Sequence, residues 1–271
     1  MKHRCARVLL YAALTALALI TFTPLLWLLL ASFQDSVFEP LSWRTFEKLT
    51  LRHFHQLFFE MPFGRYMMNS FFVAGTVTLV QLFFSSLGGF ALARYRFRGQ
   101  RLVLVVMLAT MMIPSQVLLA PLYELIVQLR LADAHLGLIV PGAVSVFGML
   151  LFRQAMLTVP EELLEAARLD GCSEFGVYWH VALPVSRPII GAFCLIAFMG
   201  TWNNFLWPQI VLHSQQLFTL PIGLNQMVGL QQQNYNVVMA GTLLSILPVA
   251  VLFFILQKEF IAGLTAGAVK G

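Results

Sequence analysis

Residues 158–188 read TVPEELLEAARLDGCSEFGVYWHVALPVSRP, and the interpretation of the whole chain depends on this stretch. It holds five of the twelve acidic residues of the chain. Long apolar runs lie on both sides of it. A polar segment fixed between apolar runs is typical of a loop that connects membrane helices. We therefore expect residues 158–188 to form a docking surface for a soluble partner.

The composition places most of the chain in lipid. Of 271 residues, 59% are hydrophobic and only 11% are charged, whereas a soluble domain carries about a quarter charged residues. The three cysteines, Cys5, Cys172 and Cys194, have no spacing typical of a disulfide framework or a metal site. The net charge of +5 is compatible with nucleic-acid binding. In a membrane protein, basic cytoplasmic loops explain it better.

Runs without charged residues predict an all-α integral membrane protein, with one transmembrane domain over residues 1–271 and six spans. The first run is long enough to cross a bilayer. A secretory signal is the alternative for it, because Lys2, Arg4 and Arg7 precede it. The run exceeds a signal core and lacks an A-x-A-like site, so we expect a retained helix. The six expected spans are 8–31, 67–93, 102–123, 136–152, 189–212 and 238–256.

The distribution of basic residues predicts the orientation in the membrane. With six spans, both termini lie on one side, together with residues 94–101 and 158–188. That side then carries twelve Lys and Arg residues, against five in the other connections. The positive-inside rule makes this side cytoplasmic. The four arginines of residues 94–101 also suggest a nucleic-acid patch, but so short a turn beside a bilayer favours a cytoplasmic loop.

Two further patterns occur in the first half of the chain. Ser85, Gly89 and Ala93 recur at every fourth position of the second span, and small residues at this spacing predict close packing against another helix. Residues 42–59 are expected to include a short helix at the membrane surface. His53 and His55 lie within it, and we expect them to be polar residues of an exposed or interfacial segment, because a metal site needs three or four convergent ligands.

Several classes of function are disfavoured by what the sequence lacks. The spans contain no Asp, Glu, Lys or Arg in their interiors, which argues against a self-powered, proton-coupled transporter. There is no G-x-x-x-x-G-K-[ST] phosphate loop, so we expect the chain not to bind ATP itself. No G-x-S-x-G or H-E-x-x-H motif and no Cys/His cluster is present. We therefore expect a protein that is not an enzyme and holds no metal or cofactor.

The fifth span contains uncharged polar residues in the sequence GTWNNFLWP. Asn203 and Asn204 are expensive in hydrocarbon unless their amides form hydrogen bonds. One interpretation is hydrogen bonding between helices. The other is that Trp202, Asn203 and Asn204 line a watery path for a polyhydroxylated solute, with the indole offering a flat apolar face. We keep both interpretations, the second as a candidate pathway.

Residues 158–188 predict two short helices joined by a glycine turn. Thr158 and Glu161 have the spacing of a capping box, and Gly171 is the expected helix stop. Ser173 is expected to start the second helix, which Pro184 is expected to close. Ala166 and Ala167 are expected to leave a low surface on which a partner can pack closely.

The same residues resemble a known family. Glu165-Ala166-Ala167, then Gly171 and Leu183-Pro184, are similar to the EAA coupling loop of permease subunits in binding-protein-dependent ABC importers. The segment around Trp202 and the C-terminal GLTAGAVKG resemble the carbohydrate-uptake branch, which includes the smaller permease of the maltose system. The resemblance covers nearly the whole chain.

The resemblance implies a type I ABC importer permease fold in the bacterial inner membrane. It implies a second, homologous permease, a pair of ATPase subunits that hold ATP and Mg²⁺, and a sugar-binding protein outside, which the polar residues 213–236 are placed to touch. It assigns ATPase coupling to Glu165, Ala166, Ala167, Asp170, Gly171, Leu183 and Pro184. It assigns a second ATPase contact to Gly263, Leu264, Thr265, Gly267 and Lys270.

The implied function is sugar uptake, coupled to ATP hydrolysis on the partner. Glycerol-phosphate, a polyol or an oligosaccharide is the alternative cargo. An anionic phosphate would need a basic group in the pathway, and the spans contain none. A self-standing secondary transporter or channel is the other alternative, and stable association with an ATPase would distinguish the two.

Overall fold

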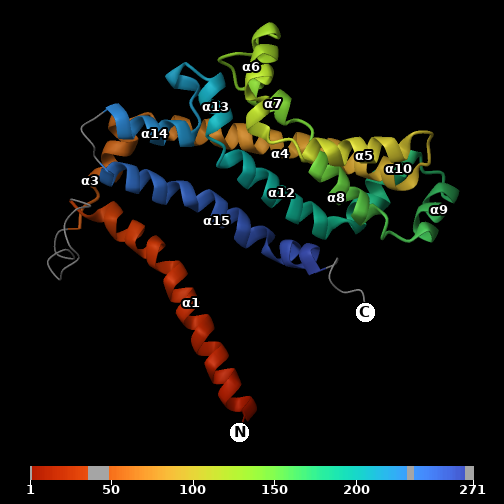
Figure 1. The fold of residues 1–271 in the computed structure, drawn as a ribbon, viewed down its shortest axis with the longest axis horizontal. Helices are drawn as coiled ribbons and strands as arrows, with labels where there is room; N and C mark the ends of the chain where they lie inside the picture. Colours follow the sequence, from red (N-terminus) through yellow and green to blue (C-terminus); the bar gives the residue numbers. More distant parts are fainter. Residues whose placement is uncertain (1, 36–48, 231–234, 266–271) are drawn as a thin grey trace. The chain divides into compact units, whose positions relative to one another are not determined.

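The computed structural model describes residues 2–35, 49–230 and 235–265, and every regular element in these ranges is a helix (Figure 1). The all-α prediction is thus confirmed. The chain falls into two compact units. The first consists of residues 1–65 and 223–248, and the second of residues 66–222 and 249–271.

Three helices are long and apolar enough to cross a membrane by themselves. They are α1 (Lys2–Phe33), α4 (Phe63–Arg94) and α15 (Tyr235–Thr265). Three further pairs of helices meet the same test together, but each pair is bent at a short break. The described residues therefore provide three candidate spans, or up to six if each bent pair counts as one.

The first unit is held together by polar contacts near the C-terminal end of α1. Asn236, at the start of α15, donates from Nδ2 to the carbonyl oxygens of Ala31 at 3.1 Å and of Gln34 at 2.6 Å. His53 Nε2 lies 2.8 Å from the same Gln34 oxygen. Satisfying these carbonyls matters because the last turn of a helix has no intrahelical donors for them.

The surface helix expected within residues 42–59 is short. It consists of α3 (Arg52–His55), which continues as a π-helical turn, η1 (Gln56–Glu60); residues 36–48 lie outside the described ranges. His55 is exposed and stacks on Phe59. His53 is buried, with 4% of its surface exposed. The prediction that both histidines are exposed or interfacial is therefore wrong for His53, whose ring is used to anchor the end of α1.

The second unit contains the central seam between α4 and α8. A Cβ atom on Gly89 would lie 2.5 Å from Cβ of Phe152, and one on Gly148 would lie 2.6 Å from Oγ of Ser85. Both helices therefore approach closely only because these residues are small. The close packing expected for the stripe of Ser85, Gly89 and Ala93 is confirmed at Ser85 and Gly89. The remaining elements between residues 100 and 156 are α5 (Gln100–Met111), η2 (Ser115–Leu118), α6 (Leu119–Gln128), α7 (Leu136–Gly142) and α8 (Val146–Met156).

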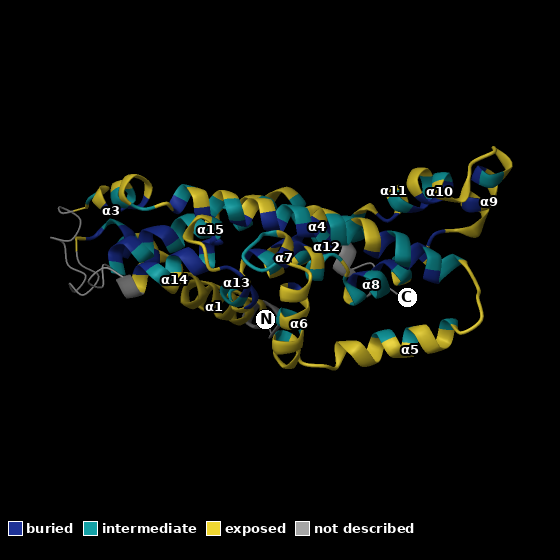
Figure 2. Cartoon of the chain, turned by 90° about the horizontal axis from the view of Figure 1, so that it is seen from above, coloured by how far each residue is buried: buried dark blue, intermediate teal, exposed yellow. Residues whose placement is uncertain are grey.

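The expected third and fourth spans are both broken. Helix α5 ends at Met111, and the chain turns by 92° into η2 and α6. Pro114 lies at the break with extended backbone angles and has no N–H to continue the α5 ladder. Between α7 and α8 the bend is 42°. No residue of α5 is buried, and most of its residues are exposed (Figure 2), so one side of the helix is open to lipid or to a partner.

The expected fifth span is also interrupted, and residues 213–236 are not simply a polar loop. Helix α12 (Arg187–Trp202) ends before the two asparagines, and α13 (Leu206–Val211) follows after a turn. After the short η4 (Gln215–Leu217), residues up to Leu230 form α14 (Leu220–Leu230). Residues 231–234 lie outside the described ranges. The last helix, α15, extends nine residues beyond the expected end of the sixth span at residue 256.

Candidate functional site

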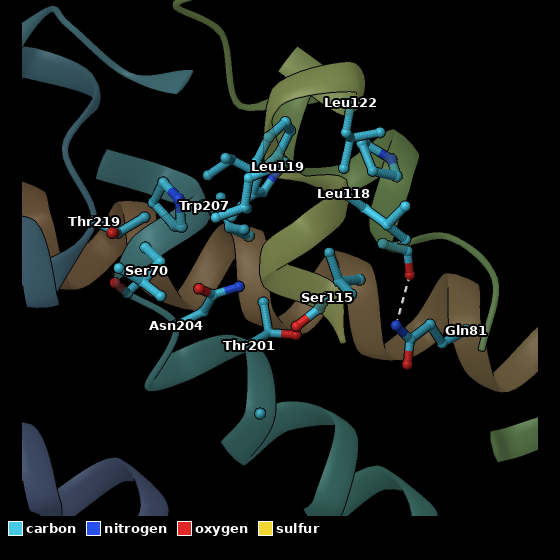
Figure 3. A pocket seen from close by; sticks show the side chains of 18 of the residues that line it. Ser70, Gln81, Ser115, Leu118, Leu119, Leu122, Thr201, Asn204, Trp207 and Thr219 are labelled. Carbon is cyan, nitrogen blue, oxygen red and sulfur yellow. Dashed lines mark hydrogen bonds between the residues drawn. The ribbon is translucent and has the colours of Figure 1, made fainter. Parts of the chain in front are cut away.

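A cavity of about 480 Å³ lies within the second unit, among α4, η2, α6, α7 and the break between α12 and α13 (Figure 3). Part of its wall is apolar and includes Trp207, Leu119 and Leu122. None of the described residues that line it is charged. Its polar lining comes from Ser70, Gln81, Ser115, Gln116, Thr201, Asn204 and Thr219.

Two of these polar groups are fixed by bonds to the backbone. Gln81 of α4 donates from Nε2 to the carbonyl oxygen of Gly142 in α7 at 2.6 Å, and this bond fixes the position of the Gln81 amide. Ser70 accepts from the backbone N–H of Leu220 at 2.7 Å. Both are placed on the rigid helix α4, so the lining is preorganised on that side.

Thr219 is a different case. It is 4% exposed, and its hydroxyl has no hydrogen-bond partner among the described residues. Thr219 also lines the cavity. A buried hydroxyl without a partner costs free energy, so this group is well suited to meet a polar ligand or a water molecule in the cavity.

The structure separates the three pathway candidates of the GTWNNFLWP segment. Asn203 and Asn204 are exposed and lie in the turn after α12, not inside a membrane helix as expected. Asn204 lines the cavity and Asn203 does not. Asn is typical of such a turn, because its amide can hydrogen-bond nearby backbone groups in place of the helix ladder.

Trp202 does not provide the expected flat face. It is 3% exposed and packs between Phe198, with ring centroids 5.5 Å apart, and Phe71, with centroids 4.9 Å apart. The indole that lines the cavity is Trp207. Its Nε1–H donates to the carbonyl oxygen of Gly137 at 3.1 Å, which fixes the ring. The sequence reasoning placed the aromatic wall five residues too early.

The polar and aromatic lining residues that the sequence did not predict are Ser70, Gln81, Ser115, Gln116, Thr201, Trp207 and Thr219. They come from four separate parts of the chain, and no local spacing relates them. The available signal was weak: Ser70 and Gln81 are two of several uncharged polar residues in the second span, eleven positions apart and therefore on the same face of a helix.

The loops at one end of this unit are tied together by Asp133. Its carboxylate accepts from the backbone N–H groups of His213 and Ser214, both at 2.9 Å, and from the Ser214 hydroxyl at 2.5 Å. These hydrogen bonds, the one from the hydroxyl above all, lower the pKa of Asp133 to about 2. His135 Nε2 lies 2.9 Å from the carbonyl oxygen of Leu217. The segment before Thr219 is thereby held in place.

The segment 158–188 folds into a hairpin of helices, which we call the coupling hairpin. It consists of α9 (Glu161–Leu169), α10 (Glu174–Val177), the π-helical η3 (Tyr178–Ala182) and α11 (Leu183–Val185). Gly171 has the left-handed φ of 85° and ends α9, as expected. The Ser173 hydroxyl accepts from the N–H of Gly176 and starts α10, also as expected.

Two details of the coupling hairpin differ from the prediction. Thr158 does not cap α9; its hydroxyl donates to the carbonyl oxygen of Ala155, and Pro160 occupies the N-cap position. Pro184 does not close the second helix, because helical structure continues to Val185, and a bend of 82° then leads into α12. Pro184 comes shortly after the π-helical turn η3, near the end of this continuous helical stretch.

The EAA residues lie on different faces of α9. Ala167 is buried in an apolar cluster with Leu164, Val177, Tyr178 and Ala182. The expected low surface therefore holds only for Ala166, which is exposed. Glu165 and Asp170 are exposed as well, as is Pro184, whereas Leu183 is partly buried. Among the described residues, Glu165 takes part in no ion pair.

The second group of expected ATPase contacts is only partly described. Gly263, Leu264 and Thr265 form the last turn of α15. Gly267 and Lys270 lie outside the described residues. Nearer in the same helix, Glu259 packs against Gly191 of α12, where an added Cβ would come within 2.4 Å of the Glu259 Cβ atom. The described end of α15 is thus in close contact with α12.

The chain is similar to a family of membrane transport proteins. The family model for the inner membrane component of binding-protein-dependent transport systems matches residues 85–264. The chain is 36% identical to the arabinooligosaccharides transport system permease protein AraQ of Halalkalibacterium halodurans, over all of both chains. It is 30% identical to the lactose transport system permease protein LacG of Rhizobium radiobacter, over 100% of this chain and 98% of that one.

A third relative and a solved structure extend the group. The sn-glycerol-3-phosphate permease protein UgpE of Shigella flexneri is 35% identical over 75% of this chain and 73% of its own. The fold is similar to that of a bacterial ABC transporter that imports the acidic polysaccharide alginate, with a TM-score of 0.83 and 20% identity, over 96% of this chain and 98% of that one. The expected importer-permease fold is therefore confirmed.

Proposed function

Since the chain belongs to the family of inner membrane components of binding-protein-dependent transport systems, we propose that it is one of two permease subunits of an ABC importer for a neutral sugar. The family assignment establishes a permease of the inner membrane. The cargo, the partner subunits and the orientation are the proposed parts. The observation that carries the choice of cargo is the chemistry of the cavity in the second unit.

The cavity has the features that a neutral sugar needs. Hydroxyl and amide groups, among them Gln81, Thr219 and Asn204, surround a space with an indole wall at Trp207. Such groups donate to and accept from sugar hydroxyls, and an aromatic face packs on the C–H face of a pyranose or furanose ring. The relatives that transport arabinooligosaccharides and lactose support this choice.

A glycerol-phosphate cargo is the second candidate, because the chain is 35% identical to a glycerol-phosphate permease. A phosphate group is normally bound by Arg, Lys or a cluster of backbone N–H groups. The described lining of the cavity contains no basic residue. For this cargo, the basic group would have to come from the partner permease.

The energy for import would come from a pair of separate ATPase subunits, which would hold ATP and Mg²⁺. Support for this comes from the coupling hairpin, whose exposed Glu165, Ala166 and Asp170 are free to contact another protein. The last turn of α15 would give a second contact. We infer cytoplasmic termini from the excess of basic residues on that side, twelve against five. A sugar-binding protein would then dock on the opposite side.

Reconstitution tests the proposal. The chain is produced with its partner permease, ATPase and solute-binding protein, and the purified complex is placed in liposomes. ATP is supplied on the side of the membrane where the ATPase lies. The solute-binding protein is first titrated by calorimetry with a panel of neutral mono- and oligosaccharides and with glycerol-3-phosphate. ATP-dependent uptake of a neutral sugar is the expected result. Uptake of glycerol-3-phosphate alone, or uptake by this chain without the ATPase, would overturn it.

A further inference from the structure

A buried arginine joins three elements beside the coupling hairpin. Arg94 is the last residue of α4, and only 9% of its side chain is exposed. Its Nη2 donates to the backbone carbonyl oxygens of Met156 and Val159, both at 2.5 Å. Its Nη1 donates to the Glu161 carboxylate at 2.7 Å. One guanidinium thus contacts the end of α8, the connecting segment and the start of α9.

The residue type suits this position. Met156 ends α8, and the last carbonyl groups of a helix have no intrahelical donors and carry partial negative charge. The planar guanidinium offers five N–H donors in a fixed arrangement, so it can bind two carbonyls and a carboxylate at once. A lysine at this position has one ammonium group and cannot span the same three acceptors in fixed directions.

A second set of contacts binds α4 to the far arm of the hairpin. The Tyr95 hydroxyl donates to the Glu174 carboxylate at 2.5 Å. Partial burial, and after it the bond to Glu174, raise the pKa of Tyr95 to about 12. Arg168 of α9 lies 2.9 Å from Glu174 through Nε and 3.6 Å from Glu161 through Nη1. Tyr95, directly after α4, is thus linked through Glu174 of α10 to Arg168 of α9.

Apolar packing fills the space behind this polar network. Phe90 of α4 packs against Tyr178 of η3, with ring centroids 5.6 Å apart. The Tyr178 and Ser86 hydroxyls lie 2.7 Å apart and are hydrogen-bonded. Both rings belong to the same buried cluster as Leu164 and Ala167 of α9. With polar contacts at the edge and a packed cluster inside, the hairpin has little freedom to move apart from α4.

We propose that Arg94 is a positioning residue for transport: it fastens the coupling hairpin to α4, so that a displacement of α9 by the ATPase moves the helix that carries the Ser70 and Gln81 wall of the cavity. The proposal rests on the proposed function. Ser70 lies near the other end of α4 from Arg94, and Gln81 lies near the middle of the same helix. Helix α4 would thus carry the motion directly from the ATPase side to the cavity.

The test compares two arginines of one loop. Arg94→Met removes the donors but keeps a long apolar side chain, and Arg96→Met is the matched control, since Arg96 is exposed and two residues away. Each reconstituted complex is assayed for sugar uptake and ATP hydrolysis. For Arg94→Met we expect about a tenfold fall in sugar imported per ATP hydrolysed, a size within the usual range of coupling between sites. Arg96→Met is expected to keep the ratio of the unaltered protein.

A second variant protects the test against misfolding. The Glu161 side chain is 53% exposed, so Glu161→Gln can be made without disturbing the core. It weakens one contact of Arg94 and is expected to lower the ratio by about threefold, the equivalent of a weak net hydrogen bond. Arg94→Lys is expected to lie between Arg94→Met and the unaltered protein.

A structural readout separates a loosened hairpin from other defects. Cys172 is exposed at the turn of the hairpin, and a spin label there, in a background with Cys5 and Cys194 replaced by Ser, reports the mobility of the turn. Mobility is expected to rise in Arg94→Met and not in Arg96→Met. An unchanged transport ratio together with unchanged label mobility in Arg94→Met would overturn the proposal. Failure of the unaltered complex to import any sugar would instead refute the proposed function.

Discussion

A Cβ atom on Gly89 would lie 2.5 Å from Cβ of Phe152, closer than two carbon atoms of packed side chains can approach. The same atom would come within 2.7 Å of the Arg153 backbone nitrogen. Backbone cannot move aside as the tip of a flexible side chain can. The seam between α4 and α8 therefore depends on the absence of a side chain at residue 89.

We expect Gly89→Ala to destabilise the protein by about 1–3 kcal/mol, the usual cost of overpacking a closed contact. Gly75→Ala is the control, because Gly75 is on the same helix and a Cβ there would meet nothing within 4 Å. Thermal unfolding of the purified variants in detergent measures the difference. Equal melting temperatures for the two variants would show that the seam can open at no cost.

The hydrogen bonds of Asp133 predict a pH-dependent stability. They lower its pKa from 3.8 to about 2, with the Ser214 hydroxyl as the largest cause. A carboxyl group whose pKa is lower in the folded state stabilises that state above its unfolded pKa, and this contribution is lost as the pH falls through the folded pKa. The stabilisation is thus present at pH 5 and above and disappears between pH 3.8 and about 2.

Asp133→Asn isolates this charge, because Asn also tolerates the left-handed φ of 52° at residue 133. At neutral pH we expect a loss of about 1 kcal/mol, the typical worth of one hydrogen bond. The melting temperatures of the two proteins should converge as the pH is lowered below 3.8. A difference of the same size at pH 3 and pH 7 would contradict this role.

Part of this architecture is readable in the sequence because it rests on local chemistry. Charge-free runs identify α1, α4 and α15, since a bilayer-spanning helix needs about 20 apolar residues wherever it occurs. The Gly171 turn is also local, because the left-handed conformation strongly favours glycine. The coupling hairpin was therefore predicted with its turn and with the start of its second helix in place.

The helix breaks and the cavity are not readable in the same way. Pro114 marks the break after α5, yet Pro24 and Pro248 lie inside continuous helices, so proline alone does not decide. Trp202 and Trp207 look equivalent in sequence, and only packing determines that Phe71 and Phe198 cover the first while the second faces the cavity. Such choices are made by tertiary contacts.

Thr219 and Thr78 offer a matched pair for testing the cavity. Both hydroxyls are buried and have no hydrogen-bond partner among the described residues, but only Thr219 lines the cavity. Thr219→Val should leave stability unchanged or slightly higher, because an unpaired buried hydroxyl is removed. It should lower the apparent affinity for sugar in uptake by about fivefold, the equivalent of one lost hydrogen bond. Thr78→Val should leave uptake unchanged, and equal effects of both variants would argue against a sugar contact at Thr219.

Gly171 allows the shape of the coupling hairpin to be tested apart from its charge. A Cβ at this position meets nothing within 4 Å, so only the φ of 85° opposes a substitution. We expect Gly171→Asn to be well tolerated and Gly171→Val to cost about 1–2 kcal/mol through backbone strain. Melting temperature and sugar imported per ATP should fall together for the Val variant. A fully coupled Gly171→Val complex would mean that the angle between α9 and α10 is not important for transport.

Glu165 is an exposed acidic residue of α9, as is Glu162, and we expect Glu165 to contact the proposed ATPase. Glu161 is engaged by Arg94 and Arg168, whereas Glu165 is exposed and takes part in no ion pair among the described residues. Glu165→Lys should therefore change the free energy of unfolding of the isolated chain by no more than about 0.5 kcal/mol, as surface substitutions do. It should weaken co-purification of the ATPase and abolish ATP-driven uptake, because a like charge would face a basic group of the partner. Glu124→Lys makes the same change of charge on α6, in a connection that the proposed orientation places on the opposite side of the membrane, and should leave both properties intact. Normal uptake by Glu165→Lys would remove Glu165 from the coupling surface, even if the rest of the hairpin still docks.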